Sequence, residues 1–248
     1  MQSESESLLG DSTVLVGIDD TDTKDSEHGT GKISRLLGAH LSERLPDLEW
    51  TGCVRQQLLI DPRVPYTTHN SSATLLCEAP PTMDRREVVE PAIDFLEANA
   101  ADGSDPGLCV GRRADVADAV REFGVVADER LLETREAYEL ARASDLFLAA
   151  CGGTGEGVIG ALAGVGRTAS GECGRFIEYG KIRSYAGTEP VERLRSDGID
   201  VVTSEGTEVE SGTLATAGWV RPLLRDGSPV LEVEARGNGR YRATNADG

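Results

Sequence analysis

Three carboxylates stand within four positions of the chain, directly after a short apolar segment. Residues 13–18 are apolar and rich in β-branched side chains, which predicts a buried strand, and Asp19, Asp20 and Asp22 follow it. The end of a buried strand is where open α/β sheets usually place a ligand. Mg²⁺ prefers oxygen ligands and is commonly held by one or two carboxylates together with substrate phosphates. We therefore interpret Asp19, Asp20 and Asp22 as candidate metal-binding and catalytic residues for a Mg²⁺-bound nucleotide such as ATP.

A glycine-containing turn follows the acidic residues and leads into an amphipathic segment. Free N–H groups at a helix start favour a bound phosphate, glycines allow its close approach, and a lysine would neutralise its charge. The turn is not a P-loop, because Ser26 and Ile33 occupy the first glycine and the hydroxyl positions of that motif. A solvated turn with a helix cap is the alternative interpretation. The nucleotide-contacting candidates of this region are Thr21, Gly29, Thr30, Gly31 and Lys32.

Two further segments offer contacts to a ligand. Residues 155–160 read Gly-x-Gly-x-x-Gly, but the string begins beyond an expected strand and outside a first βαβ unit, so it is not a dinucleotide fingerprint. Its glycines either pack a helix closely or form a second phosphate-contacting loop, for which Gly155 and Gly157 are the candidates. Asn70 lies in a polar loop between two expected strands, where it either contacts a ribose or phosphate or faces solvent.

Charge and cysteine content limit the classes of partner. The chain has 43 acidic and 25 basic residues, a net charge of −18, which repels phosphate backbones unless high salt screens it. The five cysteines are widely spaced, without a zinc-type pair, and are interpreted as buried thiols of a reducing compartment. No apolar run has membrane length, and the N-terminus lacks the pattern of a signal peptide. We expect a cytoplasmic protein without a membrane partner.

Hydrophobic periodicity predicts a mixed α/β protein that begins with a strand, the acidic loop and a helix. Strands are expected at 13–18, 54–61, 73–78, 108–110, 146–148, 175–185, 199–202, 214–224 and 230–235. Helices are expected at 32–45, 87–99, 114–123, 129–143 and 158–165, with Pro91 delaying or kinking the second. The predicted divisions are a mobile tail at 1–12, a nucleotide-binding domain at 13–80, a region at 81–190 and a small β-rich piece at 191–248. Whether the chain of the 81–190 region returns to the nucleotide-binding domain stays open.

Four sequence blocks resemble the archaeal tRNA(Ile) 2-agmatinylcytidine synthetase family and occur in that family's order. They are residues 17–22, 63–70, 105–107 and 157–163. The resemblance implies a kinase-like catalytic domain that uses ATP and Mg²⁺, accompanied by a ferredoxin-like domain that falls in the 81–190 region. It also implies that Asp19, Asp20 and Asp22 are the metal and catalytic carboxylates, and that the enzyme activates a tRNA cytidine for attack by agmatine.

Two departures from that family affect the expected function. The family's phosphorylated threonine string is replaced by Gly29-Thr30-Gly31-Lys32-Ile33, which leaves Thr30 as a candidate acceptor, and no zinc-ligand spacing follows. We therefore expect a shortened paralogue with the catalytic and ferredoxin-like parts only: an ATP-dependent phosphotransferase or ligase-type enzyme. The alternative is a non-catalytic nucleotide-binding or partner-binding module. Binding to tRNA, directly or through a protein partner, remains a third hypothesis.

Overall fold

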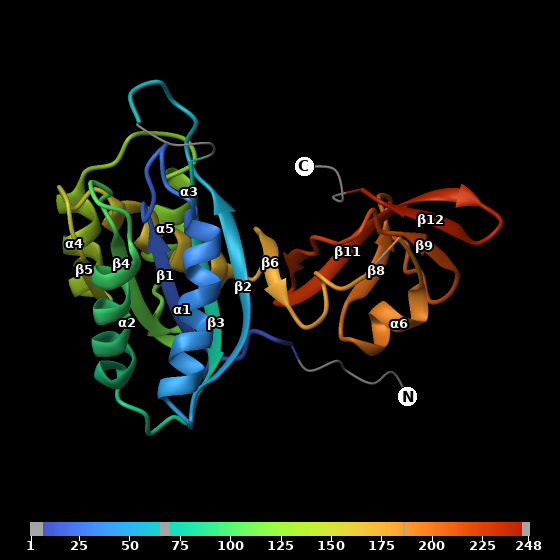
Figure 1. The fold of residues 1–248 in the computed structure, drawn as a ribbon, viewed down its shortest axis with the longest axis horizontal. Coiled ribbons are helices and arrows are strands. Elements are labelled where there is room, and N and C mark those ends of the chain that lie inside the picture. The colour runs from blue at the N-terminus through green and yellow to red at the C-terminus, as the bar shows by residue number, and fades with distance from the viewer. Residues whose placement is uncertain (1–6, 65–69, 186, 245–248) are drawn as a thin grey trace.

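A computed structural model describes residues 7–64, 70–185 and 187–244 of the chain. The chain forms two lobes joined by one continuous sheet, with β6 between them (Figure 1). The strand order is β5-β4-β1-β3-β2-β6-β10-β11-β12-β9-β7, and β8 pairs with β11. The mixed α/β fold class predicted from the sequence is confirmed.

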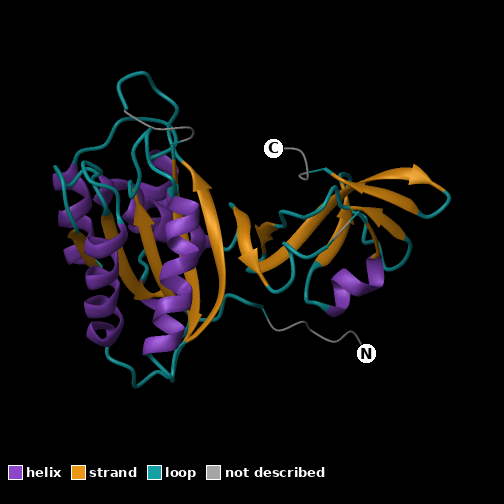
Figure 2. Ribbon diagram, viewed as in Figure 1, coloured by secondary structure: helices purple, strands orange, loops and turns teal. Residues whose placement is uncertain are grey.

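The first lobe is an antiparallel sheet covered by helices on both faces (Figure 2). Helices α1 and α2 lie on one face, and α3, α4 and α5 lie on the other (Figure 1). Its strands are β1 (Val14–Asp19), β2 (Glu49–Gln57), β3 (Ser71–Glu78), β4 (Gly107–Arg112), β5 (Phe147–Ala150) and β6 (Arg175–Tyr179). Its helices are α1 (Thr30–Arg44), α2 (Arg85–Asn99), the short 3-10 helix η1 (Arg113–Asp115), α3 (Asp118–Val126), α4 (Thr134–Ala143) and α5 (Gly157–Ser170).

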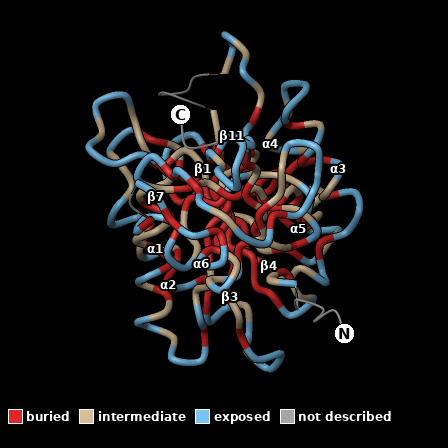
Figure 3. Tube along the Cα trace, turned by 90° about the vertical axis from the view of Figure 1, so that its right-hand side faces the viewer, coloured by how far each residue is buried: buried red, intermediate tan, exposed pale blue. Residues whose placement is uncertain are grey.

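The alternation of side chains along β1 builds two separate cores. Val14, Val16 and Ile18 join the core beneath α1 and α2, whereas Leu15 joins the core beneath α3 and α5. Successive side chains of a strand point to opposite faces, so a strand buried on both faces reads as a continuous apolar run. Figure 3 shows that buried residues line the interior strands while the connecting loops are exposed.

Helix α5 lies closer to the sheet than a helix with large side chains at the contact could lie. A methyl group added at Gly17 would come within 2.4 Å of the carbonyl oxygen of Ala161, and one at Gly164 within 2.5 Å of the Ser72 hydroxyl. On its outer side, a methyl group at Gly166 would lie 2.1 Å from the carbonyl oxygen of Val120 in α3. The small residues of α5 are therefore explained by backbone packing on both sides, because only glycine leaves room for it.

The second lobe is a small β structure with one short helix. Its elements are β7 (Thr188–Pro190), α6 (Val191–Ser196), β8 (Asp200–Thr203), β9 (Thr213–Ala215), β10 (Leu223–Arg225), β11 (Ser228–Gly237) and β12 (Arg240–Ala243). Strand β8 runs parallel to β11, and β9 runs parallel to β12. Ser7 and Leu9 of the predicted tail reach this lobe: Leu9 is buried, and its N–H donates to the carbonyl oxygen of Gly227 over 3.1 Å.

Several predicted boundaries were wrong, each for a local physical reason. The strand expected to reach Tyr185 ends at Tyr179, because the chain turns at Gly180, whose φ is +45°. The strand expected over 214–224 is split into β9 and β10 by a turn at Ala217 and Gly218, both at positive φ. The strand expected from residue 54 is β2 and begins at Glu49. Strands β7 and β12 and helix α6 were not predicted, because three to six residues carry little periodicity.

Two helix predictions also need correction. The helix expected from residue 129 begins at Thr134, because Glu133 and Glu136 form a capping box there. Pro91 does not delay α2, which begins at Arg85 behind a capping box made by Asp84 and Glu87. Within the described residues no helix is both long and apolar enough to cross a membrane.

We predict that Gly17→Ala lowers the free energy of unfolding by about 1–3 kcal/mol, because a methyl group in this contact must displace backbone rather than a side-chain tip. Gly10→Ala is the matched control, since a methyl group there meets its nearest atom at 3.8 Å. Urea denaturation of both variants measures the difference. Equal stability of the two variants would contradict the close packing of α5 on β1.

Candidate active site

A cavity of about 710 Å³ opens at the end of β1 and contains the acidic loop. Its wall combines residues from the acidic loop, the end of β2, the loop between α3 and α4, and the start of α5. Cavities of this size commonly hold small-molecule ligands or cofactors. The polar residues of the lining are Asp19, Asp20, Asp22, Thr30, Arg63, Asn70, Ser71, Arg130, Glu133, Thr134, Arg135 and Glu156. The apolar part is formed by Leu58, Leu59, Val64, Ala127, Leu131, Leu132 and Ile159, with Gly157 and Gly160.

Asp19 is held against the first turn of α5. A methyl group at Gly160 would lie 1.7 Å from Asp19 Oδ2, so the carboxylate occupies the space that a side chain would take. Burial raises the pKa of the Asp19 carboxyl to about 7, and the neighbouring charges of Asp20 and Asp22 add to the increase. A hydrogen bond from the backbone of Asp20 opposes this increase without cancelling it. Asp19 is thus a carboxyl whose charge the surrounding protein disfavours.

Asp20 sits at the turn of the loop with a φ of +52°, a left-handed conformation that aspartate tolerates better than most residues. Burial raises the pKa of its carboxyl to about 6, followed by repulsion from Asp105, Asp22 and Glu156. No ion pair neutralises Asp19 or Asp20 within the described part of the chain. A cation in the cavity would therefore relieve electrostatic repulsion that the protein itself does not relieve.

Asp22 has a structural contact that the other two aspartates lack. Its Oδ1 accepts hydrogen bonds from the N–H of Thr30 over 3.0 Å and from the Thr30 hydroxyl over 2.8 Å. The residue at the N-cap of α1, Gly29, has no side chain to make such a bond. Asp22 therefore caps α1 from a distance of eight residues and ties the acidic loop to the helix.

The structure separates the predicted nucleotide-contacting residues into two groups. Thr30, Asn70 and Gly157 line the cavity with the three aspartates, whereas Thr21, Gly29, Gly31, Lys32 and Gly155 do not. Thr30 is buried, and its hydroxyl lies 3.1 Å from that of Thr21. Residues 65–69 of the second sequence block lie outside the described residues. The roles of all these residues in ligand binding stay predictions.

The Gly-x-Gly-x-x-Gly string has a packing explanation at its second and third glycines. A methyl group at Gly157 would lie 2.1 Å from the carbonyl oxygen of Asp105, and Gly160 is the residue that Asp19 contacts. Gly155 adopts a φ of +85° in the turn before α5. Packing thus accounts for these residues whether or not a phosphate binds near them.

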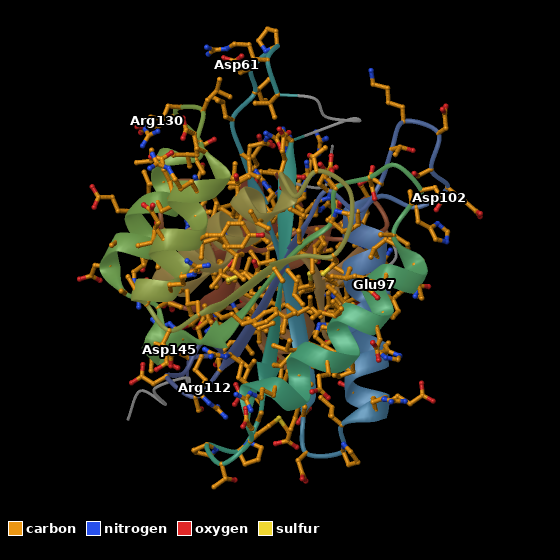
Figure 4. All side chains as sticks on the ribbon, turned by 90° about the vertical axis from the view of Figure 1, so that its left-hand side faces the viewer. Asp61, Glu97, Asp102, Arg112, Arg130 and Asp145 are labelled. Carbon is orange, nitrogen blue, oxygen red and sulfur yellow. The ribbon has the colours of Figure 1, made fainter. Side chains whose placement is uncertain are left out.

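Sequence reasoning missed the part of the cavity wall that residues 130–135 form. Arg130 and Arg135 line it, and they come from a stretch that the periodicity assigned to one continuous helix. Arg130 and Asp61, which pairs with Arg63 over 2.7 Å, lie at the same end of the molecule in Figure 4. No sequence signal marked the two arginines. The sequence did offer a signal for Asp105, because this residue is the first of the block 105–107 that resembles the synthetase family.

A metal site formed by protein side chains alone is not present in the described residues. No group of three or more His, Cys, Asp or Glu side chains in them is arranged to hold a metal ion. All five cysteines are free thiols, four of them buried, and burial raises the pKa of Cys53 to about 12. A metal in this cavity would need ligand atoms from the molecule that binds with it, as Mg²⁺ with a nucleotide has.

Comparisons with solved structures identify the fold. The complex of TiaS with its isoleucine tRNA and ATP matches with a TM-score of 0.55 and 24% identity, over 75% of this chain and 43% of that one. Apo TiaS, a tRNA agmatidine synthetase, matches with a TM-score of 0.52 and 24% identity, over 62% of this chain and 35% of that one. A tRNA fluorescent labeling enzyme matches with a TM-score of 0.52 and 25% identity, over 62% and 36%.

These likenesses show that the chain shares its fold with an ATP-using, tRNA-modifying enzyme, and they support the predicted family at the level of the fold. The chain covers between 35% and 43% of the length of these structures. No protein-family profile matches the sequence. No curated protein sequence matches it either.

We predict that Asp22→Ala lowers the free energy of unfolding by about 1 kcal/mol, because it removes the cap of α1. Asp22→Asn keeps an acceptor oxygen and should stay near the wild type, which separates the cap from the charge. Chemical denaturation measures both variants, with exposed Asp25→Ala as the control. An Asp22→Ala protein as stable as the control would rule out the capping role.

We also predict that the free energy of unfolding falls as the pH rises from about 4 to about 7. The folded state holds the Asp19 proton more tightly than the unfolded chain, whose carboxyl has a pKa near 3.8, so ionisation above that pH favours unfolding. Asp19→Asn should match the wild type near pH 4 and be more stable by about 2–4 kcal/mol at pH 8. Urea denaturation in the presence of a chelator, at several pH values, tests this. A variant with the wild-type pH dependence would contradict it.

Proposed function

We propose that the cavity binds a Mg²⁺-nucleotide and that the protein is an ATP-dependent phosphotransferase or ligase-type enzyme. The observation that carries the proposal is the pair of partly buried carboxylates without an ion pair in the described chain, Asp19 and Asp20, lining a cavity of nucleotide size. The shared fold supports it, because one of the matched structures is a complex with ATP.

The cavity wall supplies three kinds of contact that this ligand requires. The apolar side chains offer a surface for a planar base, and Asn70 offers a polar group at its edge. Arg130 and Arg135 line the same cavity as the carboxylates, and their guanidinium groups would neutralise phosphate oxygens. Asp19 and Asp20 would hold Mg²⁺, which would supply positive charge to offset that of the phosphates.

The chain's own residues would contribute positioning and charge rather than a covalent intermediate. Asp19 and Asp20 would hold the metal side of the ligand, and Asp22 would keep their loop fixed to α1. In a phosphoryl or nucleotidyl transfer, such fixed geometry and charge supply most of the rate increase. The acceptor proposed by analogy with the matched enzyme is a nucleic-acid base or a small amine, consistent with a complex that contains tRNA, an ATP analogue and agmatine.

The decisive test is isothermal titration of ATP with and without Mg²⁺, combined with analysis of the same samples for ADP, AMP and phosphoprotein. Metal-dependent binding is expected in the wild type, and Asp19→Asn and Asp20→Asn should each weaken it at least about tenfold. Asparagine tolerates the left-handed conformation at position 20, so the backbone should persist.

Asp25→Asn is the matched control, because it removes the same charge from an exposed position of the same loop outside the cavity lining. Release of AMP or ADP would name the bond that is cleaved, and binding without turnover would favour the non-catalytic alternative. Unchanged Mg²⁺-ATP binding in both Asp19→Asn and Asp20→Asn would refute the assignment.

A further inference from the structure

We infer that four arginines where the two lobes meet form a phosphate-binding site separate from the cavity. The arginine cluster comprises Arg55 in β2, Arg175 in β6, Arg183 after β6, and Arg221 before β10. These residues are distant in sequence, and the chain as a whole carries a charge of −18. In so acidic a protein, composition alone would not predict four arginines in one place.

Strand pairing brings the arginine cluster together. Arg55 and Arg175 are direct neighbours in the antiparallel pairing of β2 with β6. Arg175 in turn pairs with Leu223, two residues after Arg221. Directly paired residues place their side chains on the same face of a sheet, so Arg55 and Arg175 lie side by side. Like charges in this position destabilise a sheet unless an anion lies between them.

Trp219 fixes two more members of the arginine cluster. The guanidinium carbon of Arg221 lies 4.0 Å from the centre of the Trp219 ring, and that of Arg183 lies 5.0 Å from it. Arg183 is also held by hydrogen bonds to the carbonyl oxygen of Ile177. Stacked guanidinium groups lose little freedom on binding, and their planar donors match phosphate oxygens.

The balance of charge within the arginine cluster favours an anion. Glu178 pairs with Arg183 over 3.1 Å and with Arg35 over 3.7 Å. Arg55 and Arg175 have no ion pair within the described chain. Burial lowers the pKa of Arg55, and repulsion from Arg175 lowers it further. The paired strands therefore carry two adjacent positive charges that no carboxylate of the described chain compensates.

Ser71 connects the arginine cluster with the cavity. Its hydroxyl accepts a hydrogen bond from Arg55 Nε over 2.8 Å, and the same residue lines the cavity. A molecule bound in the cavity could therefore extend along the sheet and place a phosphate group on the arginines. Phosphate is the matching ligand chemistry, because paired guanidinium groups bind its oxygens in a bidentate manner. The source of that phosphate is a free polyphosphate or a nucleic-acid backbone.

The test measures binding of tripolyphosphate and of a twelve-nucleotide single-stranded RNA to the full chain without ATP. Arg55→Gln and Arg175→Gln should each weaken binding about tenfold or more, because each removes one charge-assisted contact. Arg86→Gln is the matched control, since it removes an equal charge at an exposed position of α2 and should change affinity less than about twofold. For RNA, each cluster variant should also reduce the slope of log affinity against log salt by about 0.7.

Trp219 provides a second readout that does not depend on removing charge. The chain has two tryptophans, so in a Trp50→Phe background the fluorescence of Trp219 should change when the phosphate probe binds. Trp219→Ala should weaken binding although no charge is lost, and Trp219→Phe should restore most of it. Thermal melting of every variant checks that the fold is retained.

The two probes distinguish the sources of the phosphate. If the arginine variants lose affinity for both probes, the site is supported and a nucleic-acid backbone can be its ligand. If they lose affinity for tripolyphosphate alone, the site is supported and its ligand is a free polyphosphate. Equal affinity of wild type, arginine variants and control for both probes would overturn the inference. Because the ATP test uses Asp19 and Asp20 and this one uses Arg55 and Arg175, either proposal can fail without the other.

Discussion

The contact of α5 with β1 is the constraint on which the rest of the molecule depends. Gly17 and Gly160 let a helix backbone approach a strand so closely that the Asp19 carboxylate fills the place of a side chain. A larger residue at either position would move the helix outward by the width of a methyl group or more. Because the start of α5 is also one wall of the cavity, the same contact sets the position of the carboxylate and the shape of the site.

Burial and like charge then give that site its electrostatic character. The fold brings Asp20 near Asp105 and Glu156, which are distant in sequence, and leaves the group without a compensating cation among the described residues. Such an arrangement costs stability in the free protein and is tolerated because dense packing elsewhere compensates for it. A ligand that carries its own cation would stabilise a site of this kind most, because the cation would offset the repulsion between the carboxylates.

The continuous sheet joins two regions of opposite charge. Strand β6 pairs with β2 in the first lobe and with β10 in the second (Figure 1). Along this connection the acidic cavity is followed by Ser71 and then by the arginine cluster. A single extended ligand would meet carboxylates at one end and guanidinium groups at the other. That order of charges follows from strand pairing rather than from the overall net charge of the chain.

The sequence by itself determined the local units: the strand, acidic loop and helix of residues 14–44 follow from apolar periodicity. The cap that Asp22 makes on this helix across eight residues came from the structure alone. The sequence left open whether Gly157 packs against the sheet or binds a phosphate, and it placed residues 130–133 in a helix although they form part of the cavity wall. Only the tertiary structure placed that wall in the same cavity as Asp19 and paired Arg55 with Arg175. The physical reason is that periodicity records which face of an element is buried, whereas the neighbour it meets depends on strand order and on backbone approach.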